Sequence, residues 1–192
     1  PLPEPQKKRQ QQIVSVGRLY AYKGFDDGIR AFAATGKHLE GWKYILLGDG
    51  PQRAELEALA KSLGVAEAVH FPGMVSNVDE WLASASICMQ PSRFEGFPNA
   101  VLESMAMGVA TISANCRSGP SDMITHDING LLVPVGDLAA LTQALDLLMT
   151  DDHRRARLGS AAMSVRQKFA PDSVLAQWNS VLFGQPLNNS TT

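Results

Sequence analysis

The chain has 192 residues, of which 45% are hydrophobic and 19% are charged, so it can bury one sizeable core and has an ordinary globular composition. Its formal net charge of −2 excludes a long-range basic field, so we expect no nucleic-acid partner and only local recognition of charged ligands. No apolar run reaches the roughly 18 residues of a membrane span, and no signal-peptide pattern begins the sequence, so a cytoplasmic location is predicted.

The two ends of the chain lack apolar periodicity. Residues 1–11 are rich in proline, glutamine and charge, which is typical of a linker or an interdomain segment. Residues 184–192 are similarly polar and are predicted to form a flexible tail. The part between them, residues 12–183, is predicted to fold as a single domain.

Short apolar runs alternate with longer amphipathic stretches through most of this part. The runs predicted as strands are residues 12–17, 44–48, 68–73, 85–91, 109–114 and 130–136. This βαβ rhythm predicts the α/β fold class, with a Rossmann-like doubly wound parallel sheet and helices on both faces. After the last strand, successive helices without strands are predicted over residues 137–149, 151–169 and 171–183.

The loop after the first strand, GRLYAYKGF, combines a glycine with two cations. In an open parallel sheet, ligands bind beyond the carboxyl ends of the strands, where this loop would lie. Gly17 permits close backbone approach, and Arg18 and Lys23 would stand at a turn that enters a helix, which suits a diphosphate. Two solvated surface cations are the alternative.

The loop after the second strand, GDGP, is not a dinucleotide fingerprint, because Arg53 stands where a third glycine would be needed. It is predicted to form a tight turn that places Pro51 at the first position of a helix. A phosphate cradle is the weaker alternative, since two glycines alone are weak evidence.

The stretch PSRFEGFPNAVLESMAMG follows the fourth strand and carries a predicted helix over residues 98–107. Pro98 fits the first helical position and has no N–H, so free backbone amides must come from Phe97, Asn99 and Ala100. These donors and the positive end of the helix would face the ligand.

Two glutamates of this stretch, Glu95 and Glu103, are candidate ligand-binding carboxylates. Glu95 precedes the predicted helix, and Glu103 lies inside it, about 7.5 Å along the axis. This arrangement does not oppose two carboxyl groups across one glycosidic bond, whereas it suits two hydroxyl-bearing parts of one extended ligand. The structural alternative is that Glu95 interacts with the helix dipole and Glu103 forms a surface salt bridge.

Other residues with reactive side chains are expected to be structural. Cys88 and Cys116 lack CxxC spacing and are predicted to be reduced structural thiols. The candidate loops hold no DxD pair or His and Asp cluster, and Asp26 and Asp27 are predicted to lie on a solvated helix face, so no metal or cofactor is expected. The tryptophans are predicted to pack in the core rather than to stack on sugars: Trp42, Trp81 and Trp178.

Four segments, taken in order, resemble one known family: GRLYAYKGF, GDGP, FPGMV and EGFPNAVLESMAMGVATISA. They are similar to the C-terminal, nucleotide-sugar-binding domain of retaining glycosyltransferases of the GT-B architecture, in family 4 or glycosyl transferases group 1. The resemblance covers about residues 12–183, and the two glutamates form its most specific part. Pro98 is one allowed variant, although it removes an amide that glycine would supply.

The resemblance implies a role for each matching residue. Arg18 and Lys23, after Gly17, would bind the donor diphosphate and act in catalysis together with Glu95, which would contact the transferred sugar. Glu103 would accept hydrogen bonds from the ribose hydroxyls. The other implied donor-binding positions are Val75, whose backbone would read the base, and Gly96, Phe97, Pro98, Asn99 and Ala100 around the sugar and phosphates.

The implied function is transfer of a sugar from a nucleotide-sugar to a glycan or lipid-linked acceptor with retention of configuration, and UDP is favoured over GDP and ADP as the nucleotide. The chain is expected to be only the C-terminal domain of such a hexosyltransferase, and inactive alone, because the acceptor site belongs to an N-terminal domain. The closing helix over residues 171–183 would cross back toward that domain. The full-length protein would associate peripherally with the inner face of the membrane.

Other classes of function remain open at this point. A non-catalytic module would bind nucleotide-sugars in the same crevice without transferring anything. A sugar-nucleotide epimerase or a phosphorylase relative would share the fold, since fold does not fix function. An epimerase needs acid and base residues that converge on the sugar, and a pyridoxal-phosphate phosphorylase needs a Schiff-base lysine, neither of which is evident in the candidate loops.

Overall fold

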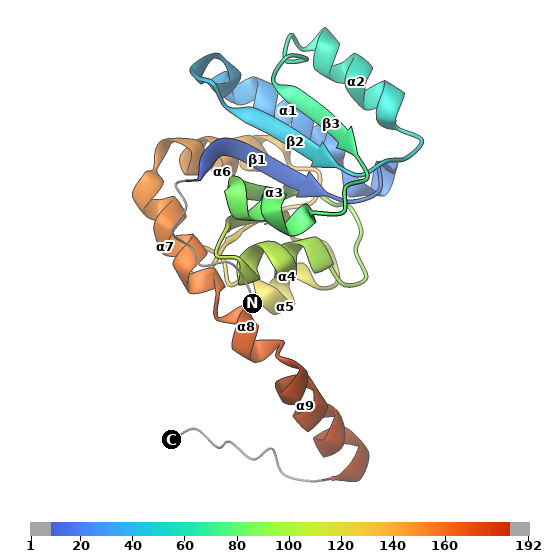
Figure 1. Cartoon of the computed structure of the whole chain (residues 1–192), viewed down its shortest axis with the longest axis vertical. Helices are drawn as coiled ribbons and strands as arrows, with labels where there is room; N and C mark the ends of the chain where they lie inside the picture. The colour runs from blue at the N-terminus through green and yellow to red at the C-terminus, as the bar shows by residue number, and fades with distance from the viewer. Residues whose placement is uncertain (1–8, 185–192) are drawn as a thin grey trace.

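The predicted strands form a six-stranded sheet in which neighbours pair in parallel in the order β3-β2-β1-β4-β5-β6. Figure 1 shows β3, β2 and β1 side by side in this order. This computed structural model describes residues 9–184. The strands are β1 (Gln10–Val16), β2 (Lys43–Leu47), β3 (Val69–Gly73), β4 (Ala85–Gln90), β5 (Ala110–Ala114) and β6 (Leu131–Val133). The strand order reverses between β1 and β4, so their carboxyl ends are the switch point at which doubly wound sheets bind ligands.

Helices cover both faces of the sheet, which confirms the predicted fold class. They are α1 (Phe25–Thr35), α2 (Arg53–Ser62), α3 (Val78–Ser84), α4 (Asn99–Ala106), α5 (Pro120–Met123), α6 (Leu138–Thr150), α7 (Asp152–Ala162), α8 (Val165–Lys168) and α9 (Pro171–Phe183), with the 3-10 helices η1 (Ala21–Lys23) and η2 (Lys37–Glu40). Helices α1, α2 and α6 pack on one face, and α3, α4 and α5 lie on the other (Figure 1).

The strands are buried on both faces, which is why they appear in the sequence as continuous apolar runs. Successive residues point into opposite layers of the core. Ile13 packs in the cluster that includes Phe32 of α1 and Leu145 of α6, whereas Val14 packs in the cluster that includes Leu82 of α3. All five side chains are 0% exposed. The core therefore holds the switch point in place from both sides.

Two predicted elements are shorter than expected. The helix predicted over residues 151–169 is broken into α7 and α8. The last strand, predicted over residues 130–136, ends at Val133, because Pro134 follows and has no N–H to donate to the neighbouring strand.

The terminal predictions fall largely outside the described residues. Strand β1 begins at Gln10, inside the segment predicted as a linker over residues 1–11. Residues 1–8 and 185–192 lie outside the described part of the chain, so the linker and the tail over residues 184–192 stay predictions.

Helix α9 projects away from the body of the molecule (Figure 1). None of its residues is buried, and Trp178 is 58% exposed, so the prediction that this tryptophan packs in the core is wrong. Trp42 is buried as predicted, at 2% exposure. The difference arises because α9 extends beyond the sheet and its apolar side chains meet no other layer of the described structure. No helix among residues 9–184 has the length and apolar character needed to cross a bilayer.

Candidate functional site

The candidate site is built by the two loops that flank the switch point. The loop after β1 (residues 17–24, including η1) carries Arg18 and Lys23, and the loop after β4 (residues 91–98) carries Glu95. Because both strands are parallel and adjacent, their following loops leave the sheet at the same edge. The predicted cations and the first predicted carboxylate therefore start from neighbouring positions.

The glycines of the GDGP loop let the β2–α2 connection press against the backbone of the first loop. A Cβ atom at Gly48 would lie 2.0 Å from the Gly17 carbonyl oxygen, and one at Gly50 would lie 2.6 Å from the Leu19 carbonyl oxygen. The Leu19 amide donates to the Asp49 carbonyl at 2.9 Å. These glycines thus support the loop that carries Arg18, and they do so by backbone contact.

The same packing corrects the prediction for Pro51. Helix α2 begins at Arg53, and Pro51 lies in the turn before it rather than at the first helical position. The amide of Gln52 donates to the Leu19 carbonyl at 3.1 Å, which holds this turn against the first loop and delays the helix.

Lys23 and Glu95 form an ion pair between the two loops. Lys23 Nζ lies 2.7 Å from Glu95 Oε1, and the side chains are only 16% and 11% exposed. Ser92 Oγ donates to the same carboxylate oxygen at 2.7 Å. The lysine stem covers Gly17, where a Cβ atom would lie 3.3 Å from Lys23 Cε. The structure therefore brings together three predicted site residues and gives Glu95 a lysine partner.

Arg18 is exposed and rests against an aromatic side chain. Its guanidinium carbon lies 5.1 Å from the centre of the Tyr20 ring, and that ring stacks on Tyr22 at 5.9 Å. Lys23 Nζ in turn lies 5.6 Å from the centre of the Tyr22 ring. Among residues 9–184, no carboxylate forms an ion pair with Arg18. Its charge is available to an anionic ligand.

The helix that follows Glu95 starts one residue later than predicted. Pro98 has ψ 78 and is the residue before α4, so Asn99 is the first helical residue. The Asn99 amide donates to the Phe97 carbonyl at 3.0 Å and is not free, contrary to the prediction. Pro98 packs closely against the loop after β5, since a Cβ atom at Gly119 would lie 2.3 Å from its Cδ. In the described hydrogen bonds, Gly96, Phe97 and Ala100 donate no amide.

Glu103 stands apart from the other charged site residues. Within the described part of the chain, no cation lies within ion-pair distance of it, so the surface salt bridge considered above is absent there. Partial burial raises the pKa of its carboxyl above the ordinary value. No described hydrogen bond joins it to Arg18, Lys23 or Glu95. Glu103 is exposed overall, and within the described part of the chain its carboxylate accepts no hydrogen bond.

Val75 follows β3 and is half-buried. It packs, with Val16 and Val78, against the core cluster on the α3 side of the sheet. None of the described hydrogen bonds engages the backbone N–H or C=O of Val75. A base-reading role would require these groups to be free in this way.

Asp26 and Asp27 do not form a solvated helix face, so that prediction is wrong. Both lie in the first turn of α1 and pair with Arg93 of the loop after β4, at 2.8 Å and 2.6 Å. Sequence spacing could not reveal this contact, because it depends on how β1 and β4 align. Arg93 was not among the predicted site residues.

The remaining predictions concern metals and thiols. Among residues 9–184, no three His, Cys, Asp or Glu side chains gather in a way that could hold a metal ion. Cys88 and Cys116 are free and buried, and burial raises the pKa of the Cys88 thiol to about 12.

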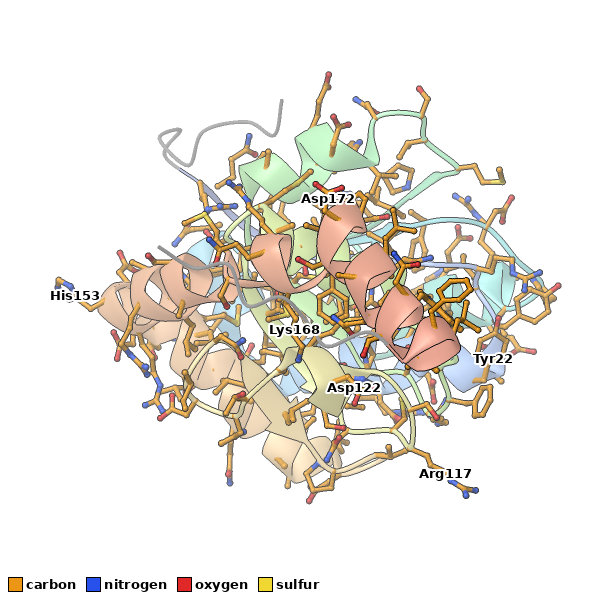
Figure 2. All side chains as sticks on the ribbon, turned by 90° about the horizontal axis from the view of Figure 1, so that it is seen from below. Tyr22, Arg117, Asp122, His153, Lys168 and Asp172 are labelled. Carbon is orange, nitrogen blue, oxygen red and sulfur yellow. The ribbon has the colours of Figure 1, made fainter. Side chains whose placement is uncertain are left out.

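In the view from below, Arg117 of the loop after β5 points away from the body of the molecule, whereas Lys168 and Asp122 lie near the middle of the picture (Figure 2). Lys168 Nζ donates to the Asp122 carbonyl.

A family model described as glycosyl transferases group 1 matches residues 3–165. The chain is 32% identical to an alpha-1,4-N-acetyl-D-galactosaminyltransferase of Campylobacter jejuni, over 89% of this chain and 47% of that protein, whose name gives a saccharide on PP-undecaprenol.

Solved structures share the fold. A mutant of S. aureus TarM in complex with UDP is similar over 94% of this chain and 37% of that one, with a TM-score of 0.86 and 20% identity. The C-terminal domain of a group 1 glycosyl transferase, LpcC from Francisella tularensis, is similar over 82% of this chain and 85% of that one, with a TM-score of 0.75 and 26% identity. The chain spans half or less of the length of the first curated relatives that it matches.

Proposed function

The chain belongs to the glycosyl transferases group 1 family, and on that premise we propose that it is the C-terminal, donor-binding half of a glycosyltransferase of the GT-B architecture. Its role is to hold a nucleotide-sugar at the switch point while the sugar passes to an acceptor bound elsewhere in the whole protein. The observation that carries this proposal is the Lys23–Glu95 ion pair, which joins a candidate diphosphate cation to a candidate sugar-binding carboxylate between the loops after β1 and β4.

The proposed donor replaces this one ion pair with two contacts. The diphosphate binds to Lys23 and Arg18. A sugar hydroxyl donates to Glu95, which the hydrogen bond from Ser92 keeps in place. The amides before and within the first turn of α4 face the same part of the donor, and the positive end of that helix favours its charge. Glu103 accepts hydrogen bonds from the ribose, which relieves its partial desolvation.

Transfer follows from where the charge develops. When the bond between the sugar and the diphosphate breaks, negative charge grows on the leaving nucleoside diphosphate. Arg18, Lys23 and the amides at α4 stand where that charge appears, and preorganised donors of this kind stabilise a transition state more than a ground state. We propose that these groups suffice and that no metal ion is needed.

The finer features of the proposal have separate support. UDP is the proposed nucleotide, because the S. aureus TarM structure was obtained with UDP. A glycan or lipid-linked acceptor is proposed from the PP-undecaprenol in the name of the C. jejuni relative. Retention of configuration, membership of family 4 and inactivity of this half alone rest on the resemblance of the motifs. So does peripheral membrane association of the whole protein, whereas a cytoplasmic location stays the prediction made from the sequence pattern.

Calorimetric titration of this chain with UDP, GDP and ADP in the presence of EDTA tests the proposal. One of the three is expected to bind saturably, and the Glu103→Ala variant is expected to lose at least tenfold in affinity, because a charge-assisted hydrogen bond contributes about 1.5–3 kcal/mol. Glu57→Ala is the matched control, since Glu57 is also a helical glutamate and pairs with Arg53 on α2. Absence of binding by all three nucleotides would contradict the proposed function.

A further inference from the structure

Arg93 lies two residues before Glu95, and both terminal nitrogens of its guanidinium bond to another part of the protein. Its Nη1 and Nη2 atoms donate to the two carboxylate oxygens of Asp26 at 2.9 and 2.8 Å, and Nη2 also donates to Asp27 Oδ2 at 2.6 Å. Nη1 further donates to the Ala21 carbonyl at 2.5 Å. An arginine with this many donated bonds has no free fork to offer a phosphate.

The backbone reinforces the same contact. The amides of Arg93 and Phe94 donate to the Tyr22 carbonyl at 2.7 and 3.4 Å. A Cβ atom at Gly24 would lie 2.2 Å from the Pro91 carbonyl oxygen, so the two loops touch backbone to backbone. Lys23 lies between Tyr22 and Gly24, and Glu95 directly follows Phe94. The segment that carries the cation and the segment that carries the carboxylate are therefore fastened to each other.

We propose that Arg93 is a positioning residue for the donor site, which acts through Asp26 and Asp27 to hold Glu95 at a fixed distance from Lys23. This inference rests on the proposed function. Arg93 itself contacts no donor. It sets the separation between Lys23, which binds the diphosphate, and Glu95, which binds the sugar. This separation has to match the donor, because the diphosphate and the sugar of the donor are covalently joined.

The charges around Arg93 fit this role. Burial acts to raise the pKa of Asp26, but its hydrogen bonds and charge interaction with Arg93 lower it below the ordinary value. The pKa of Asp27 is raised, by burial and by the neighbouring Asp26. Two adjacent carboxylates at the start of α1 thus share one cation, and without Arg93 they would repel each other beside the loop that holds Lys23.

The test compares Arg93→Met with Arg157→Met. Arg157 also pairs with an aspartate, Asp127, at 2.9 Å, but on a different part of the molecule, so both variants lose an arginine–aspartate contact. UDP-N-acetylglucosamine, which carries both a diphosphate and a sugar, is titrated into each by calorimetry, and the unfolding midpoint of each is measured. Arg93→Met is expected to bind UDP-N-acetylglucosamine about 10- to 100-fold more weakly, because the separation of the two binding groups no longer matches the joined diphosphate and sugar, and a small misplacement can cost that much. Arg157→Met is expected to bind like the unmodified chain, and a purely structural role would lower the unfolding midpoint of both variants without separating their affinities.

Combined substitutions identify the route of the effect. If Arg93 acts through the two aspartates, Asp26→Asn with Asp27→Asn weakens UDP-N-acetylglucosamine binding as well, and adding Arg93→Met to that pair causes no further loss. If Arg93 contacted the ligand directly, the losses would add. Arg93→Lys is expected to restore only part of the affinity, since an ammonium cannot hold both carboxylates in a fork.

Hydrogen exchange provides a readout that needs no ligand. In Arg93→Met, the amides of residues 93 and 94 are expected to exchange faster, because their bonds to the Tyr22 carbonyl lose the side-chain contact beside them. Unchanged exchange, or unchanged UDP-N-acetylglucosamine affinity in a chain that does bind this ligand, overturns the inference about Arg93. If the unmodified chain binds none of UDP, GDP and ADP, the proposed function fails, and the exchange rates alone then decide whether Arg93 holds the loops together.

Discussion

The two glutamates of one short stretch are held in opposite ways. Glu95 is 11% exposed and accepts hydrogen bonds from Lys23 and Ser92. Glu103, on α4, has no cationic partner among residues 9–184, and partial burial raises the pKa of its carboxyl. A ligand must therefore displace a protein cation at the first glutamate, whereas at the second it meets an exposed carboxylate that has no cationic partner among residues 9–184. The site thus has a preassembled end, formed by Lys23 and Glu95, and an open end, formed by Glu103.

The largest effect on stability is expected at Gly24, where the two loops of the preassembled end touch backbone to backbone. Gly24→Ala places a methyl group 2.2 Å from the Pro91 carbonyl oxygen at φ 65, so it should cost about 2–4 kcal/mol of stability from overpacking and backbone strain. Gly36→Ala is a close control, because Gly36 has φ 67 but nothing within 4 Å of the added atom, and only about 1 kcal/mol is expected. Urea unfolding of both variants measures the difference. Equal losses would show that the loops after β1 and β4 can separate freely.

Removing the cation of the ion pair is expected to have the next largest effect. Lys23→Met takes a positive charge from the proposed diphosphate site and leaves Glu95 buried without its partner, so UDP binding should weaken about 100-fold. Lys37→Met removes an equivalent lysine, which pairs with the exposed Glu40 on η2, and should change UDP affinity by less than about twofold. Calorimetric titration compares the two, and similar affinities would mean that Lys23 does not meet the diphosphate.

The sequence predicted most of the fold and part of the difference between the two ends of the site. Buried strands were predictable because both faces of a parallel sheet are apolar, and Arg18, Lys23 and Glu95 were predicted from their positions directly after strands. Whether those three residues bind a donor stays a prediction. Spacing places residues at one edge of a sheet but does not say which of them touch.

The contacts that the sequence did not predict are those between loops. The Arg93 contact with Asp26 depends on the alignment of β1 with β4, and Pro98, which precedes the helix, packs against Gly119 of the loop after β5. The exposure of Trp178 was not predicted because a contact that its helix pattern suggests is missing from the described chain. An apolar helix pattern predicts a buried face, and the described chain contains no layer against α9.

A third substitution separates the sugar end from the diphosphate end. Glu95→Gln keeps a hydrogen-bonding side chain next to Ser92 but no longer holds Lys23 by charge. Binding of UDP-N-acetylglucosamine should weaken about tenfold, because a hydroxyl loses a charged acceptor. Binding of UDP should stay equal or tighten by a few-fold, because Lys23 no longer has to leave a carboxylate. Equal losses for both ligands would place Glu95 at the diphosphate or outside the site.

The smallest expected effect is a pH dependence at the open end. Because partial burial raises the pKa of Glu103 above the ordinary value of 4.5, this side chain takes up a proton at a higher pH than an exposed glutamate does. Ribose hydroxyls bind its ionised form, so bound ligand lowers that pKa, and affinity must fall as the pH drops through the raised value. The UDP phosphates also titrate, so Glu103→Gln serves as the reference, since it shares their titration. The ratio of the two affinities should be about tenfold near pH 7 and should shrink as the pH falls through the raised pKa of Glu103, which begins at a higher pH than for an exposed glutamate. Cys88 lies near Glu103 but stays a neutral thiol throughout, because its pKa is about 12. A ratio that does not change with pH would show that Glu103 does not bind the nucleotide as a carboxylate.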